Sequence, residues 1–470
     1  MGDSNKTVYP YIPNSSPQVQ KEMMEEVGVQ DLWELYEEIP EHLRFKGELD
    51  IPEAILDEYS MKKHIEKLLG KNLSTSDCVS FLGGGCANHY VPAVVDEITT
   101  RGELLTCYGA ESWADHGKYQ IFTEYNSMLA ELLGTEVTSV PQYDGGQALA
   151  TAICMANRIN GRTKTLVPAS INPQNKSIVE NYLDSAQEAL KIELVYVEYD
   201  KETGLLDLED LKSKLDENVS SVVAEPVSFL GVMESQIAQI ASMAKAAGAE
   251  FITYVDPISL GLMEAPVEYG ADIVCGDFHS LGLHQAFGNG QAGFISTMGE
   301  AKYLNEYKDF IYGFAEPEKE GEYVFGNLLI DRTHYSQRAK GKEYTGTGVN
   351  LWMVSAAVYM ALMGPEGFRE VDETILYNTA YAAKKLSGLE GVKPAFSKPS
   401  FQEITVDFNE TGKTVSQINK ALLERGIFGG LDLSDDFPSL GQSALYAFTE
   451  VTGKEEIDEL VSALAEILKK

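Results

Sequence analysis

The sequence predicts an α/β protein in which helices cover both faces of a mostly parallel sheet. Short β-rich segments of continuous apolar residues recur through the middle of the chain, which is typical of strands buried on both sides. Helical segments such as residues 208–215 and 237–247 separate most of the first five strands. The 470 residues, 44% of them hydrophobic and 23% charged, can bury such a sheet and imply more than one domain. The expected strands are residues 165–168, 193–197, 221–224, 251–255, 273–275 and 292–296.

Residues 1–75 are predicted to form a helical arm that precedes the sheet in the sequence. Prolines punctuate its start, and a short amphipathic helix begins at Gln30 and ends near Pro40. A second helix has apolar residues every three or four positions between Ile55 and Leu69. The polar character of the whole stretch indicates an arm rather than a domain with its own core.

Two domains are expected after the arm. Residues 76–335 contain the predicted strands and form the large α/β domain. Residues 336–470 form a small α+β domain, in which a helix over 352–363 is stopped by Gly364-Pro365 and another begins after Asp372. The remaining elements of this domain are a strand over 403–407 and helices over 415–424 and 455–468.

Composition restricts the partners and the compartment. A formal net charge of -35 disfavours nucleic acid and anionic membranes as partners, because like charges repel. The five cysteines have no metal-ligand spacing, and their odd number fits reduced thiols. No apolar run approaches the 18 residues of a membrane span, and the N-terminus lacks the apolar core of a signal peptide. The cytoplasm is the expected location.

The stretch from Phe251 to Phe294 carries the most informative motif. A buried strand ends in Val255-Asp256-Pro257, and a second strand leads into Gly276-Asp277-Phe278-His279-Ser280. This arrangement resembles pyridoxal-phosphate enzymes of the aspartate-aminotransferase type, in which the second strand leads into the lysine that holds the cofactor. Here Ser280 stands at that place, and no lysine occurs between Lys245 and Lys302. The resemblance implies a scaffold of this type without its covalent anchor.

Short motifs in order along nearly the whole chain indicate one family. The most specific are Phe81-Leu-Gly-Gly-Gly85 and His89-Tyr-Val-Pro-Ala-Val-Val95. The others include Tyr11-Ile-Pro-Asn14, Leu49-Asp-Ile-Pro52, Tyr143-Asp-Gly-Gly146, Glu268-Tyr-Gly-Ala-Asp-Ile-Val274, Gly364-Pro-Glu-Gly367 and Leu423-Glu-Arg-Gly-Ile427. On these motifs the chain resembles subunit 1, the α subunit, of the two-subunit glycine dehydrogenase (decarboxylating), the P protein of the glycine cleavage system.

The resemblance implies a fold, an assembly and a reaction. The fold would be type I of the pyridoxal-phosphate enzymes, with a mostly parallel sheet in the large domain. Two kinds of subunit would form an α2β2 assembly, and the homologous β subunit would carry the pyridoxal phosphate. The assembly would decarboxylate glycine and pass the aminomethyl group to the lipoyl arm of the H protein. The α subunit would be inactive without its β partner.

Asp144, Gly145, Gly146, Asp256 and Ser280 are the candidate cofactor-binding residues. Asp256 ends a strand where the carboxylate that holds the pyridine ring would lie, but Asp-Pro is also a common turn pair. The two glycines would let the backbone approach an anion at a helix N-terminus, or Asp144 simply caps that helix. Because Ser280 replaces the lysine, the resemblance implies a vestigial or interface site.

The sequence assigns no residue a catalytic role, but His89, Tyr90, His116 and His279 are candidates. His89 and Tyr90 follow a glycine triplet, an arrangement that suggests the rim of a site, whereas a lone histidine is usually structural. His279 adjoins the position of the missing lysine and could act as a general base, although loss of chemistry is the competing interpretation. His116 lies in a segment that departs from the family pattern.

A basic cluster stands out in this acidic chain as a candidate anion site. It contains Arg332, Arg338 and Lys340, with His334 and Lys342 nearby. Arginine and lysine side chains here could bind a carboxylate, a phosphate or an acidic partner. The alternative is a solvated loop whose charges are balanced by neighbouring carboxylates.

Departures from the family pattern leave other functions open. They occur where ligands would be handled, at residues 114–117, 172–174, 288–290, 343–349 and 435–437. A divergent member of the family could act on another small amino acid or amine. A non-catalytic scaffold or regulatory protein is a further alternative, and a pyridoxal-phosphate enzyme that uses Lys340 or Lys342 would need its lysine in an unexpected segment.

Overall fold

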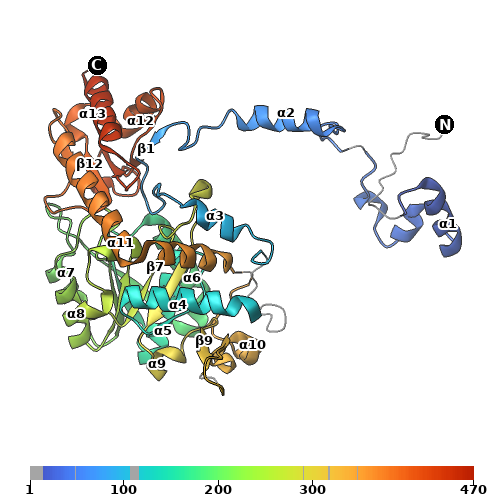
Figure 1. The fold of residues 1–470 in the computed structure, drawn as a ribbon, viewed down its shortest axis with the longest axis horizontal. Helices are drawn as coiled ribbons and strands as arrows, with labels where there is room; N and C mark the ends of the chain where they lie inside the picture. The colour runs from blue at the N-terminus through green and yellow to red at the C-terminus, as the bar shows by residue number, and fades with distance from the viewer. Residues whose placement is uncertain are drawn as a thin grey trace. The chain divides into compact units, whose positions relative to one another are not determined.

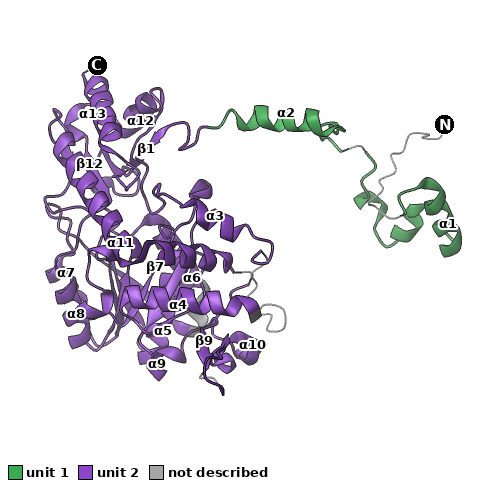
Figure 2. Cartoon of the chain, in the orientation of Figure 1, with its two compact units in different colours: residues 1–72 green, residues 73–470 purple. Residues whose placement is uncertain are grey.

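The computed structural model describes most of the chain in two compact units. The described residues are 14–47, 49–105, 116–288, 290–315, 318–346 and 348–469, except for the side chains of residues 116 and 185–189. The units are Met1–Asn72 and Leu73–Lys470 (Figure 2). The boundaries expected near residues 75 and 335 remain predictions.

The first unit consists of short helices without a core. Its elements are α1 (Pro17–Val27), η1 (Leu32–Tyr36), η2 (Glu41–Leu43) and α2 (Glu58–Leu69). Asp31 and Glu34 form a capping box at η1, and Asp57 accepts a hydrogen bond from the Ser60 amide at the start of α2. None of the described residues in this unit is buried. Side-chain caps therefore support η1 and α2, and apolar packing among the described residues of the unit does not.

The second unit is built on a seven-stranded sheet in the order β2-β8-β7-β6-β5-β3-β4 (Figure 1). The pairs from β7 to β4 are parallel, whereas β8 runs antiparallel to both β7 and β2. The sheet confirms the predicted mostly parallel α/β class. Its strands are β2 (Val137–Thr138), β3 (Lys164–Pro168), β4 (Glu193–Val197), β5 (Val219–Ala224), β6 (Glu250–Tyr254), β7 (Ile273–Asp277) and β8 (Gly293–Thr297).

Both faces of this sheet are covered, because its central strands are apolar on both sides. Along β6, Phe251 belongs to one buried cluster and Ile252 to the other. The Phe251 cluster contains residues of α4 (Tyr119–Leu133), α8 (Ile237–Ala246) and α11 (Leu351–Leu386). The Ile252 cluster contains residues of α5 (Gly145–Asn160) and α6 (Pro173–Leu190). The alternation of side chains along a strand thus explains why continuous apolar runs mark it.

Helix α11 differs from the prediction for this stretch. Residues 352–363 are helical as expected, but the second helix begins before Asp372 and not after it, as predicted. The chain becomes non-helical at Gly364, with φ 57° and ψ -179°, and helix resumes directly with Pro365. Proline is tolerated in the first turn of a helix, where its missing N–H has no intrahelical partner. Gly364-Pro365 is therefore a kink rather than the end of the element.

The C-terminal part forms a second, antiparallel sheet in the order β11-β12-β15-β14. Its strands are β11 (Lys393–Pro394), β12 (Glu403–Asp407), β14 (Leu431–Asp432) and β15 (Ser443–Ala447). Helices α12 (Val415–Leu423) and α13 (Lys454–Leu468) contribute Ile418 and Leu460 to its core. An early segment joins this part, because β1 (Val79–Ser80) pairs with β13 (Ile427–Phe428). This pairing brings the glycine triplet next to β12.

Within the described residues, no helix is long and apolar enough to cross a membrane.

Candidate functional site

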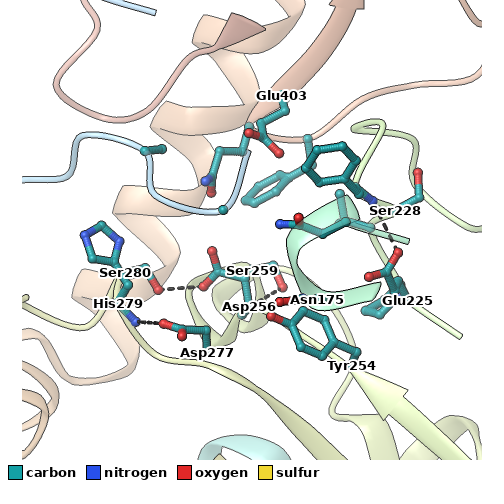
Figure 3. Close-up of a pocket in the computed structure, with 18 of the residues that line it drawn as sticks. Asn175, Glu225, Ser228, Tyr254, Asp256, Ser259, Asp277, His279, Ser280 and Glu403 are labelled. Carbon is teal, nitrogen blue, oxygen red and sulfur yellow. Dashed lines mark hydrogen bonds between the residues drawn. The ribbon is translucent and has the colours of Figure 1, made fainter. Parts of the chain in front are cut away.

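A pocket lies beside the carboxyl ends of three neighbouring parallel strands (Figure 3). Glu225 follows β5, Asp256 lies two residues after β6, and Asp277 is the last residue of β7. All three line the pocket, as does Glu403 from the C-terminal sheet. Ligands of open α/β sheets commonly bind at this edge. These four residues and the space they surround are called the acidic pocket below.

Asp256 and Ser280 contact each other in the acidic pocket. The Ser280 hydroxyl donates a 2.5 Å hydrogen bond to Asp256 Oδ1, which also accepts from the Ile258 amide at 3.1 Å. Burial raises the pKa of Asp256, while His89 and these hydrogen bonds oppose the increase. Asp256 thus serves both as a helix cap at η4 (Pro257–Gly261) and as a pocket carboxylate. The two interpretations of this residue from the sequence are compatible.

Asp277 occupies the N-terminus of α5. Its Oδ2 accepts a hydrogen bond from the Gly145 amide at 3.1 Å, and its Oδ1 accepts from the His279 amide at 2.8 Å. Asp144 caps the same helix by accepting from the Gln147 amide at 2.8 Å. Burial raises the pKa of Asp277 to about 8 despite these donors. Side-chain carboxylates of the chain itself thus occupy the helix N-terminus that was a candidate phosphate site.

His89 is held by a carboxylate from the C-terminal part. Its Nδ1 lies 2.9 Å from Glu450 Oε2, and Glu450 Oε1 accepts from the Tyr90 amide at 2.7 Å. Burial opposes the charge on His89, but Glu450 outweighs it and raises the His89 pKa. Burial likewise opposes ionisation of Glu450, and His89 holds the Glu450 pKa below its ordinary value. The buried pair is therefore ionic.

His279 lies beside this pair but stays neutral. Its ring centre is 6.2 Å from that of His89, and its Nε2 is 3.8 Å from Cys86 Sγ. Burial, together with the neighbouring charge of His89, lowers the His279 pKa to about 3. A neutral imidazole of this kind cannot balance the carboxylates around it.

Two further carboxylates complete the acidic pocket. Burial raises the pKa of Glu225 to about 8 and that of Glu403 to about 7. Glu403 Oε1 accepts a 2.5 Å hydrogen bond from the Gly84 amide, with Gly84 at a φ of 93° that favours glycine. The glycine triplet is therefore needed where its backbone approaches Glu403 closely.

The structure gathers some of the predicted site residues and separates others. His89, Asp256, His279 and Ser280 all line the acidic pocket. Asp144, Gly145 and Gly146 lie at the start of α5 and reach the pocket through Asp277. The Tyr90 side chain is 63% exposed. The His116 side chain lies outside the described residues.

The basic cluster is divided between internal and exposed positions. Arg332 Nη1 donates 2.6 Å hydrogen bonds to the carbonyls of Tyr307 and Asp309. Lys342 lies 3.0 Å from Glu306, whereas Arg338 and Lys340 are exposed. Arg332 and Lys342 are thus engaged with the chain itself, and an anion site at Arg332, Arg338 and Lys340 remains a prediction.

Sequence reasoning missed Glu225, Asp277, Glu403 and Glu450. A signal existed for the first two, because each stands at the end of a predicted parallel strand, where side chains share one edge of the sheet. No local signal marks Glu403 or Glu450, since each meets its partner across more than 300 residues of sequence.

Solved structures with a similar fold define the class of protein. A sphingosine-1-phosphate lyase from Burkholderia pseudomallei has a TM-score of 0.63 and 13% identity and covers 92% of this chain and 94% of its own. A cysteine desulfurase from Thermococcus onnurineus has a TM-score of 0.62 and 16% identity and covers 86% of this chain and 98% of its own. At these identities the likeness concerns the fold alone. The fold is type I of the pyridoxal-phosphate-dependent enzymes, as predicted.

Closer relatives then define the family. The profile of the glycine cleavage system P-protein family matches residues 10–464. A probable glycine dehydrogenase (decarboxylating) subunit 1 from Staphylothermus marinus is 35% identical over 469 residues, covering 98% of this chain and 99% of that protein. Its counterpart from Thermococcus onnurineus is 36% identical, with 97% and 99% covered. A crystal structure of glycine decarboxylase (P-protein) in inhibitor-bound form has a TM-score of 0.84 and 32% identity, covering 98% of this chain and 100% of its own. The chain belongs to the glycine cleavage system P-protein family.

The residues of the acidic pocket do not fit pyridoxal phosphate. Ser280, which the sequence predicts to stand at the lysine position, donates its hydroxyl to Asp256. At the start of α5, the Gly145 amide donates its hydrogen bond to Asp277, so it is not available to a phosphate. A Cβ added at Gly145 would collide with the Tyr254 hydroxyl, so this backbone is already closely covered. Among the described residues that line the pocket there is no lysine or arginine to meet a phosphate. The pocket of this chain therefore lacks the groups that would hold the cofactor.

Proposed function

We propose that this chain is the α subunit of a glycine-cleavage-type P protein and works with a homologous β subunit that carries the pyridoxal phosphate. The assembly decarboxylates glycine and transfers the aminomethyl group to the lipoyl arm of the H protein. When bound to the β subunit, the cofactor supplies the electron sink for decarboxylation. The α subunit contributes a stable fold type I partner and is inactive alone.

The observation that carries this proposal is the engagement of Ser280 with Asp256. A lysine at position 280 would have to point toward the carboxylate at the end of β6, and the serine hydroxyl instead fills that contact at 2.5 Å. Membership of the P-protein family over residues 10–464 supports a role in the same reaction. The relatives' name, subunit 1, supports a second subunit as the partner. If each α subunit pairs with one β subunit, two such pairs make the α2β2 assembly.

The test is reconstitution with the β subunit encoded by a neighbouring gene. The purified chain, the β subunit, pyridoxal phosphate and lipoylated H protein are mixed, and glycine-dependent CO2 exchange is followed, with each subunit alone as a control. We expect exchange only in the complete mixture. Exchange by the β subunit alone at the same rate would refute the requirement for this chain. Failure of the two subunits to associate would favour a scaffold for some other protein.

A different small amino acid or amine is the second candidate substrate. The departures from the family pattern favour it, and one of them, Asn172, lines the acidic pocket and donates to the Gly84 carbonyl at 3.1 Å. Substrate profiling of the reconstituted complex separates the two candidates. Faster decarboxylation of another amino acid than of glycine, with the same subunits and H protein, would assign the divergent function.

A further inference from the structure

The acidic pocket gathers carboxyl groups that no lysine or arginine side chain of its described lining pairs. Four carboxyl groups line it, and the lining residues in the described ranges include no lysine or arginine. His89 is engaged with Glu450, and His279 is neutral. Buried charges are normally paired, because an unpaired charge away from water is costly. The pocket is therefore suited to a ligand that brings its own positive charge.

Glu225 supplies a free acceptor in this pocket. The residue is 7% exposed, and its Oε2 accepts a single hydrogen bond, of 3.3 Å, from the Phe229 amide. Its Oε1 has no hydrogen-bond donor in the described part of the chain. Figure 3 shows Glu225 on the side of the pocket away from His279 and Ser280. Because Glu225 lines the pocket and its Oε1 has no donor from the described chain, this oxygen is open to a donor from a ligand that enters the pocket.

Aromatic rings and amides make up much of the remaining wall. Phe229, Phe401 and Tyr254 line the pocket, together with Asn175 and Gln402. Ring faces attract organic cations, and amide oxygens accept hydrogen bonds from ammonium groups. No group of three histidine, cysteine or acidic side chains with metal-ligand geometry occurs within the described ranges. The wall therefore favours an organic cation over a metal ion.

We propose that the acidic pocket binds a primary ammonium group, held by the carboxylates of Glu225 and Glu403 against the ring of Phe229. An ammonium group has three donors and no acceptor, which matches a pocket of acceptors. A phosphate or another anion is excluded by the same carboxylates. This site goes beyond the proposed function, in which the pocket of this chain takes no part. The ammonium group belongs either to a free amine or to an amino acid.

Titration calorimetry on the full-length chain without its partner tests this site. Ethylammonium chloride, glycine and sodium phosphate are the probes, with potassium chloride at matched ionic strength to account for counterions at the acidic surface. We expect one saturable site for ethylammonium, with a Kd of about 1 mM or below. Glu225→Gln and Glu403→Gln should each weaken binding about tenfold or more, because each replaces an oxygen that can accept from the ammonium group by an amide NH2, which can only donate. Glu264→Gln, the same change at an exposed position, should have no effect.

Each outcome decides a different point. Binding of ethylammonium but not glycine assigns a free amine, and equal binding of glycine assigns an amino acid. No binding of either amine, or binding that both pocket variants leave unchanged, overturns the site, as does saturable binding of phosphate to the pocket.

Circular dichroism checks that the variants fold. If either glutamine variant does not fold, Phe229→Leu tests the ring instead and should weaken ethylammonium binding about threefold or more. Because no β subunit is present, failure here leaves the proposed function untouched.

Discussion

Two clusters of buried or partly buried ionisable groups in the second unit are organised in opposite ways. In the acidic pocket, carboxyl groups gather without a lysine or arginine among the described lining residues. In a second cluster, which we call the paired-charge network, Arg158 lies 2.7 Å from Glu306 and 2.8 Å from Glu343. Lys342 lies 3.0 Å from the same Glu306. The same types of carboxylate are thus paired in one place and unpaired in the other.

The contrast distinguishes carboxylates that are paired within the chain from carboxyl groups that the proposed ammonium site would pair with a ligand. The arginine and lysine side chains of the paired-charge network satisfy its carboxylates within the chain, which ties α5 to residues 306 and 343. The carboxyl groups of the acidic pocket are partly protonated instead, because burial raises the pKa of Glu225 and Asp277 to about 8. A fold that needed these groups only for stability would gain more by pairing them.

The largest effect is expected from breaking the paired-charge network. Arg158→Ala leaves Glu306 and Glu343 without their shared partner in a site where the arginine side chain is 14% exposed. We expect a loss of about 4 kcal/mol in the free energy of unfolding, since Glu343 is left to the hydroxyls of Thr151 and Tyr182, and Glu306 keeps Lys342 but loses the arginine. Urea denaturation measures it. Arg101→Ala, which breaks an exposed pair with Glu103, is the control and should leave the midpoint unchanged. An equal effect of both variants would contradict the distinction.

A smaller loss is expected when the ionic pair of His89 and Glu450 beside the pocket is broken. The raised pKa of His89 adds stability that is present below its ordinary pKa and is lost as the pH rises through the folded value. The lowered pKa of Glu450 adds stability that is lost as the pH falls through its own folded value. Glu450→Gln should therefore cost about 3 kcal/mol near pH 6 and less at high pH. Thermal unfolding across pH 5–9 measures this loss.

Asp96→Asn is the matched control for the Glu450 variant. Asp96 lies 2.9 Å from His284 in an exposed histidine–carboxylate pair, with side chains 51% and 64% exposed. Solvent screens this pair, so the substitution should not change the pH dependence of unfolding. A pH-independent effect of Glu450→Gln would mean that His89 is neutral in the folded protein.

Glu225→Gln should increase the free energy of unfolding, whereas Arg158→Ala and Glu450→Gln should decrease it. The folded pKa of Glu225, about 8, lies above its ordinary value, so its contribution to stability falls as the pH rises from about 4.5 to 8. Replacing it by a neutral amide should raise the free energy of unfolding by about 2 kcal/mol at pH 8 and leave it unchanged at pH 4. Urea denaturation at both pH values checks this. A loss of stability at pH 8 would show that the Glu225 carboxylate has a partner after all.

The smallest effect is expected from restoring a lysine to the acidic pocket. Ser280→Lys should not produce the absorbance of an imine with added pyridoxal phosphate, because Asp277 already occupies the helix N-terminus that a phosphate would need. Absorbance spectra before and after borohydride reduction, with mass measurement of the chain, provide the readout. A reduced cofactor adduct on the introduced side chain would contradict the incompatibility of this pocket with the cofactor.

Much of the fold and part of the site could be predicted from the sequence. Apolar runs bounded by helices identified six of the seven strands of the large sheet, but not the two-residue β2. Asp256 and Ser280, which come two and three residues after β6 and β7, both line the acidic pocket, and their role as cofactor-site residues remains a prediction. The kink at Gly364 was predicted as a stop, since the local pattern does not reveal that Pro365 begins a helix packed in the same core. The positions of Glu403 and Glu450 at the site could not be predicted, because no local sequence pattern marks either residue.

The sequence by itself determined the fold class and the family, and it predicts that Ser280 stands where the cofactor-binding lysine is expected. These conclusions follow from local patterns, since the alternation of apolar side chains and the order of the motifs can be read directly from the sequence. Only the tertiary structure decided which charges meet. It brings Glu403 to Gly84 and Glu450 to His89, and it pairs Arg158 while leaving Glu225 with a free oxygen. Electrostatic energy depends on distance and burial in space, and neither can be read from separation along the sequence.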